Sequence, residues 1–135
     1  MMQTTVKSRV ISLVEDDAGV RKSLTNLLNS AGWTVDPFGS AEEYLSSGRP
    51  VARCCLILDI KLPHMSGIEL QELLLSRADP VPVIFLTANA ANNSRTRALR
   101  NGALAFFYKP FNADILLTFV QLAAARSEMA LANCH

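Results

Sequence analysis

The sequence has no long hydrophobic run and no excess of charge of either sign. No apolar stretch approaches the roughly 18 residues of a membrane span, and the opening MMQTTVKSRV has no hydrophobic core of a signal peptide. The 13 Lys and Arg residues balance 12 Asp and Glu residues, which removes any general electrostatic reason to bind nucleic acid or an anionic membrane. We therefore expect a cytoplasmic protein that neither enters a membrane nor binds nucleic acid directly.

Cysteine is also scarce. Cys54 and Cys55 are neighbours in an apolar run and Cys134 lies near the C-terminus, with no CxxC or Cys/His ligand spacing. This pattern favours ordinary packing residues over a redox or metal-binding role. Apolar residues make up 50% of the chain and charged residues 19%, which is the composition of a folded protein, and 135 residues suit a single domain.

Apolar runs typical of strands alternate with helical patterns along the chain. The predicted strands are 9–14, 34–38, 54–60, 82–86 and 103–108. The predicted helices are about 18–31, 41–47, 66–76, a weaker helix that ends at residue 102, and 112 to about 130. Ser40 with Glu43 predicts a capping box, and Asn112 predicts an N-cap. Because buried parallel strands need crossover helices, the pattern predicts an α/β fold, a doubly wound (βα)5 five-stranded parallel sheet.

Chemically reactive residues follow the carboxyl ends of the predicted strands. The first strand is followed by Glu15, Asp16 and Asp17, the third by Asp59, the fourth ends near Thr87, and the fifth is followed by Lys109. Ligands bind beyond these ends in open α/β sheets, and the flavodoxin-like strand order 2-1-3-4-5 would bring Asp16 and Asp17 beside Asp59. Thr87 and Lys109 would flank Asp59 on its other side.

A carboxylate cluster of this kind suits one metal and one reaction. Mg²⁺, with Mn²⁺ as the alternative, accepts one or two protein oxygens, keeps several waters and shares a phosphate. Asp59 could then attack phosphorus and form an aspartyl phosphate. The metal and Lys109 would neutralise the charge that grows on the phosphoryl oxygens.

Four stretches of the sequence carry a family resemblance: EDD after the first strand, LILDIKLPHMSG around Asp59, FLTA at the fourth strand and FFYKPF at the fifth. Together they resemble the receiver domain of two-component response regulators, with a core over about residues 8–125 and a tail over 126–135. VRKSL, GALAFFYKPF and LPHMSGIEL are most similar to the FixJ-like subgroup. The expected CheY-like strand order also rests on this resemblance.

The resemblance implies a phosphorylation site and a metal site. Asp59 would accept phosphate from a sensor histidine kinase or a histidine phosphotransfer protein. Asp16 and Asp17 would hold Mg²⁺ together with Asp59, with the backbone carbonyl of Lys61 as a further ligand. Such a protein assists only its own phosphorylation and dephosphorylation, so we expect a switch in a phosphorelay and not an enzyme.

The resemblance also implies how the switch is read. Thr87 would move to the phosphoryl group, Ala88 would leave the acceptor reachable, Phe106 would turn inward, and Lys109 would pair with the phosphate. The Lys109–Pro110 peptide bond is expected to be cis. The fourth helix, fifth strand and last helix would then present a changed surface to an unidentified downstream protein or to a second copy in a phosphorylation-dependent homodimer.

Several alternatives stay open. The chain could be the isolated receiver of a FixJ/LuxR-type transcription factor, or a pseudo-receiver that binds partners without phosphate. A phosphohydrolase of the haloacid dehalogenase type generally carries an acid two residues after its nucleophile, where this chain has Lys61. Arg95, Arg97 and Arg100 form either a solvated face, which is favoured, or a docking patch.

Overall fold

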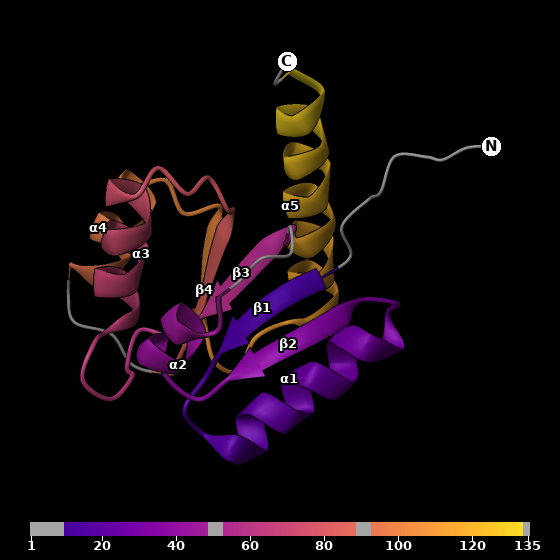
Figure 1. Ribbon diagram of the computed structural model, residues 1–135. Coiled ribbons are helices and arrows are strands. Elements are labelled where there is room, and N and C mark those ends of the chain that lie inside the picture. Colours follow the sequence, from indigo (N-terminus) through magenta and orange to yellow (C-terminus); the bar gives the residue numbers. More distant parts are fainter. Residues whose placement is uncertain (1–9, 49–52, 89–92, 134–135) are drawn as a thin grey trace.

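The computed structural model describes residues 10–48, 53–88 and 93–133, and five strands alternate with five helices in this part of the chain (Figure 1). The strands are β1 (Val10–Val14), β2 (Thr34–Phe38), β3 (Cys55–Leu58), β4 (Val83–Thr87) and β5 (Ala105–Tyr108). The helices are α1 (Ala18–Ser30), α2 (Ala41–Ser46), α3 (Gly67–Ser76), α4 (Ser94–Arg100) and α5 (Ala113–Asn133). The predicted (βα)5 architecture is confirmed.

The five strands form one parallel sheet in the order β2-β1-β3-β4-β5. This is the strand order that was predicted. Every residue of β3 and β4 is buried, which matches their continuous apolar sequences, whereas β2 lies at an edge and is largely exposed. In the register, Val14 pairs with Leu58, so β1 and β3 end side by side.

Helices cover both faces of the sheet and divide the apolar core in two. On one face α1 and α5 contribute buried residues such as Leu28 and Leu116, and on the other α2, α3 and α4 contribute Tyr44, Leu70 and Ala98 (Figure 1). Each fully buried leucine contributes about 2 kcal/mol of transfer free energy. Cys54 and Cys55 also lie buried in this core, as expected of packing residues, whereas position 134 is outside the described residues.

Side-chain caps start several of the helices. The hydroxyl of Ser40 accepts from the Glu43 N–H at 3.0 Å, but the Glu43 carboxylate accepts from the Gly39 N–H, so the predicted capping box forms only in part. A complete box lies at the start of α3, where Ser66 and Glu69 satisfy each other's N–H groups. These caps satisfy donors that a helix start otherwise leaves unpaired.

Candidate functional site

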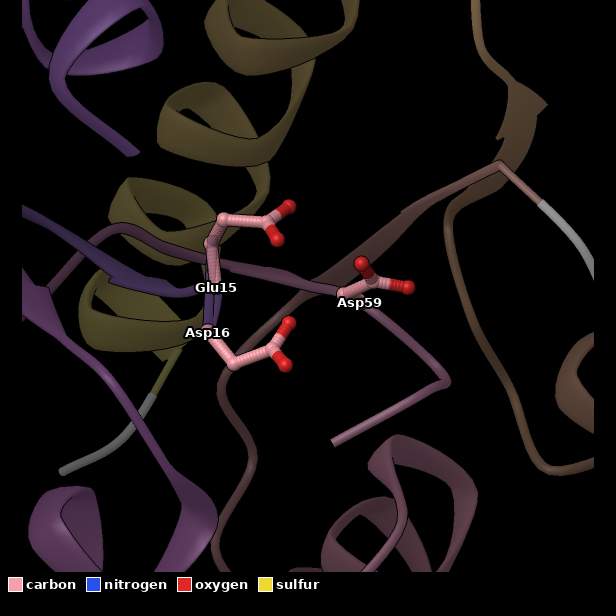
Figure 2. Close-up of side chains that lie close together, drawn as sticks. All are labelled: Glu15, Asp16 and Asp59. Atoms are coloured by element: carbon pink, nitrogen blue, oxygen red, sulfur yellow. The ribbon is translucent and has the colours of Figure 1, made fainter. Parts of the chain in front are cut away.

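Three carboxylates meet at the carboxyl ends of β1 and β3. Glu15, Asp16 and Asp59 each offer an oxygen within 4.8 Å of the others, and Figure 2 shows the three groups turned toward a common space. The sheet brings them together, because the residues that follow the Val14–Leu58 pair are neighbours and the Asp59 N–H donates to the Val14 carbonyl at 3.1 Å. Glu15 and Asp59 are buried, whereas Asp16 is exposed.

Asp17 does not belong to this cluster, contrary to our expectation. Its Oδ1 accepts from the Val20 N–H at 3.0 Å and so caps α1. Glu15 takes the position expected of Asp17, because its N–H still pairs with the Phe38 carbonyl at 3.0 Å and it continues the path of β1 into the site. An aspartate directly before a helix is a common N-cap, and this was the sequence signal that could have separated Asp17 from its neighbours.

Lys109 places an ammonium group between two of these acids. Its Nζ lies 2.7 Å from Glu15 Oε1 and 3.3 Å from Asp59 Oδ2. Burial raises the pKa of Glu15, although hydrogen bonds from Lys109 and the Asp17 N–H work in the opposite direction. Burial works to lower the pKa of Lys109, but the hydrogen bond to Glu15 and the charges of Asp59 and Glu15 outweigh it and raise that pKa. Lys109 is therefore held as a cation.

The turn after Asp59 closes tightly behind its carboxylate. The Lys61 N–H donates to Asp59 Oδ1 at 3.2 Å, and the Lys61 side chain itself is exposed. The Gly67 N–H at the start of α3 donates to the Ile60 carbonyl at 2.9 Å. A Cβ atom on Gly67 would lie only 2.0 Å from the Asp59 carbonyl oxygen, so only glycine allows this approach. Each oxygen of the Asp59 carboxylate accepts one hydrogen bond. Oδ1 accepts from the Lys61 N–H, and Oδ2 accepts from Lys109 Nζ.

The ends of β4 and β5 complete the same edge of the sheet. Thr87 is fully buried at the end of β4, and Ala88 after it is exposed. The Lys109 N–H donates to the Thr87 carbonyl at 2.8 Å, which ties the two strand ends together. The Lys109–Pro110 peptide bond is cis.

Phe106 lies inside the domain, next to an exposed ring. It is 8% exposed, and its ring centroid lies 5.8 Å from that of Phe85 and 5.3 Å from that of Tyr108. Tyr108 is 50% exposed. A movement of Phe106 would therefore reach the surface of β5 through this ring contact.

Comparison with known families agrees with this geometry. Residues 11–121 match the model of the response regulator receiver domain. The chain belongs to this family. Relatives such as FixJ of Bradyrhizobium diazoefficiens are named as transcriptional regulatory proteins, so the family has a role in signalling.

Several relatives of this receiver domain are close in sequence or structure. Nodulation protein W of Bradyrhizobium diazoefficiens is 41% identical over 117 residues, which are 87% of this chain and 52% of that protein. The structure of the response regulator StyR has a TM-score of 0.80 at 40% identity, covering 91% of this chain and 64% of that one. The crystal structure of FixJ-N has a TM-score of 0.78 at 30% identity, covering 86% and 93%. The chain thus spans about half the length of the curated relatives it matches.

Among the described residues of the receiver domain, no helix has both the length and the apolar character that crossing a bilayer requires.

Proposed function

We propose that this chain is a phosphorylation-dependent switch in which Asp59 accepts a phosphoryl group from a sensor histidine kinase or a histidine phosphotransfer protein. The observation that carries the proposal is the buried Asp59 carboxylate with the Lys109 ammonium 3.3 Å away and the exposed Asp16 carboxylate beside it. Phosphoryl transfer to aspartate needs a nucleophilic carboxylate, a fixed cation and a group open to solvent. Membership of the receiver family supports the same assignment.

The donor set fits Mg²⁺, with Mn²⁺ as the alternative. Asp16 and Asp59 would hold the cation together with the backbone carbonyl of Lys61, and the exposed position of Asp16 leaves room for waters to complete the shell. The charge of Glu15 is already compensated by Lys109, so Glu15 would act chiefly by orienting that lysine. When bound, Mg²⁺ neutralises negative charge on the phosphoryl oxygens.

The residues of the chain would share the transfer step as follows. A carboxylate oxygen of Asp59 forms a bond to phosphorus as the P–N bond of a donor phosphohistidine breaks, and the histidine nitrogen keeps the electron pair. Lys109 already bonds to Asp59 Oδ2, so it can pair with a phosphoryl oxygen after only a small movement away from Glu15. The Thr87 hydroxyl would move toward the same group, and the small, exposed Ala88 would leave the acceptor reachable.

Phosphorylation would be read at the surface formed by α4, β5 and α5. The modification adds about one negative charge at Asp59, and only an arrangement with Thr87 and Lys109 close to the phosphoryl group is favoured by it. Phosphorylation would favour the inward position of Phe106 over an outward one, and the ring contact with Tyr108 supports transmission of that change to the surface. A downstream protein, or a second copy of the chain, would bind there.

A second candidate is the receiver part of a longer transcriptional regulator of the FixJ/LuxR type. The specific observation in its favour is that the chain covers 52% of nodulation protein W and 58% of FixJ from the same species. The reading frame around this sequence tests it directly, since a regulator of this type would continue into a DNA-binding domain.

Intact-mass spectrometry tests the switch itself. After incubation with Mg²⁺ and acetyl phosphate, we expect the wild type to gain one phosphoryl group and Asp59→Asn to gain none. Omission of Mg²⁺ should abolish the gain in the wild type. No gain under conditions in which a control receiver responds would refute phosphoacceptance and leave a phosphate-independent binding module.

A further inference from the structure

A cluster of hydrogen bonds joins α3 to α4. The Glu72 carboxylate accepts from Arg97 Nε at 2.8 Å, from Arg97 Nη2 at 2.6 Å and from Asn101 Nδ2 at 2.9 Å. Beside it Gln71, which is only 3% exposed, donates from Nε2 to the Ala98 carbonyl at 3.0 Å and accepts from Asn101 at 3.3 Å. We name these five residues the α3–α4 clamp. It joins segments that lie 27 positions apart in the chain.

The clamp contributes to holding α4 in place. The helix has seven residues, and its N-cap residue Asn93 makes no side-chain capping bond. It buries only Ser94 and Ala98, whose side chains remove little apolar area from water compared with the leucines of α3. A helix of two turns is unstable alone, and Gln71 donates a second hydrogen bond to the Ala98 carbonyl, which also accepts from the Ala103 N–H. The position of α4 therefore depends strongly on α3.

The helix that carries the clamp also touches the acceptor. The first residue of α3, Gly67, packs directly on the backbone of Asp59, as the 2.0 Å approach to its carbonyl oxygen shows. On the other side, α4 follows the strand that ends at Thr87, and Ala98 lies in the same apolar cluster as the buried ring of Phe106. The α3–α4 clamp thus links two helices. One is α3, which packs on the backbone of Asp59, and the other is α4, which follows Thr87 in the chain and shares an apolar cluster with Phe106.

We propose that Gln71 and Glu72 are positioning residues that set the affinity of the Asp59 pocket for a phosphoryl group by fixing α4 against α3. The inference rests on the proposed function, in which an inward Phe106 accompanies phosphorylation. The clamp is formed in the arrangement where Phe106 is buried, and on this proposal it loosens when Phe106 turns outward. Interactions that stabilise one of two arrangements raise the affinity of a ligand that prefers it.

The test is a titration with beryllofluoride in the presence of Mg²⁺, followed by ¹⁹F NMR of the bound fluoride. Gln71→Met keeps the size of the side chain and removes its hydrogen bonds, and Arg97→Ala removes the charged one of the two partners of Glu72. We expect both to weaken beryllofluoride binding by about fivefold or more while the half-saturating Mg²⁺ concentration stays unchanged. Hydrogen exchange of the α4 amides should become faster in both variants.

Two controls separate the clamp from a general effect on the fold. Arg100 is exposed and lies, like Arg97, in the last turn of α4, so Arg100→Ala removes the same charge from the same helix end outside the clamp. It should bind beryllofluoride as the wild type does. The double variant with Glu72→Arg and Arg97→Glu restores a pair of opposite charges and should recover most of the affinity lost in Arg97→Ala.

The outcomes distinguish the clamp from the proposed function. A wild type that binds no beryllofluoride refutes phosphoacceptance and the coupling with it. A responsive wild type with clamp variants of equal or tighter affinity refutes the coupling alone. Unchanged exchange of the α4 amides in Gln71→Met and Arg97→Ala refutes the clamp as a determinant of the α4 position.

Discussion

Replacing Gly67 by alanine would place a methyl group against the backbone that carries the acceptor. The added Cβ would lie 2.0 Å from the Asp59 carbonyl oxygen, 2.9 Å from the Asp59 carbonyl carbon and 3.0 Å from the Ile60 Cα. All three are backbone atoms, so no side chain can rotate out of the way. The start of α3 and the turn after Asp59 must separate instead.

The size of this separation indicates its cost. Ordinary van der Waals contact begins at 3.4 Å, so the methyl group and the carbonyl oxygen must move apart by 3.4 − 2.0 = 1.4 Å. The movement would weaken the 2.9 Å hydrogen bond from the Gly67 N–H to the Ile60 carbonyl. Overpacking costs about 1–3 kcal/mol and the weakened bond about 1 kcal/mol, against about 1 kcal/mol gained from the higher helix propensity of alanine. We expect the free energy of unfolding to fall by about 2 kcal/mol.

Urea unfolding followed by far-UV circular dichroism measures this change. Gly19→Ala is the matched control, because Gly19 also lies in the first turn of a helix but its Cβ would meet only the side-chain oxygen of Asp17, at 3.3 Å. We expect this control to stay within about 0.5 kcal/mol of the wild type. Beryllofluoride binding should weaken only in Gly67→Ala, since only there is the Asp59 backbone displaced. A Gly67→Ala protein with wild-type stability and wild-type binding would refute the reasoning.

Two further predictions concern the acids after β1. Asp17→Ala should lower the free energy of unfolding by about 1 kcal/mol through the lost cap and leave the Mg²⁺ dependence of phosphorylation unchanged, whereas Asp16→Ala should raise the half-saturating Mg²⁺ concentration. The reverse pattern in a Mg²⁺ titration would restore Asp17 to the metal site. Because burial raises the pKa of Glu15, the folded protein binds this proton more tightly than the unfolded chain, and the free energy of unfolding should fall as the pH rises from the ordinary value of 4.5 toward the raised one. Glu15→Gln should remove this slope in urea titrations over that pH range, and an identical slope in both proteins would contradict the assignment.

The inner strands of the sheet could be predicted because burial on both faces leaves a continuous apolar sequence. β3 and β4 show this most clearly, and their predicted bounds differ from the observed ones by two residues or fewer. The start of β5 was placed two residues early because Ala103 is apolar. Its N–H pairs with the Ala98 carbonyl and closes the end of α4, so it does not enter the sheet. Apolar character predicts burial, but Ala103 is only partly buried and packs beside the end of α4.

The edge of the sheet that carries Asp59 was predictable for a similar reason. Parallel strands place their carboxyl ends along one edge, so Asp59, Thr87 and Lys109 could be brought together from the chain alone. The sequence did not separate Asp17 from the acid cluster because three consecutive acids span the change from strand to helix. The direction of each side chain there depends on where the backbone turns, and Asp17 had already become the cap of α1.

The sequence by itself determined the family, the alternation of strands and helices, and the position of Asp59 at the end of a buried strand, because these depend on residue types and their order. Tertiary structure alone decided that Glu15 faces Lys109 and Asp59, that Gly67 packs on the acceptor backbone, and that Gln71 and Glu72 hold α4. Such contacts depend on the directions of side chains and on the packing of segments far apart in the chain. The local pattern of residues contains neither the directions of the side chains nor the packing of distant segments.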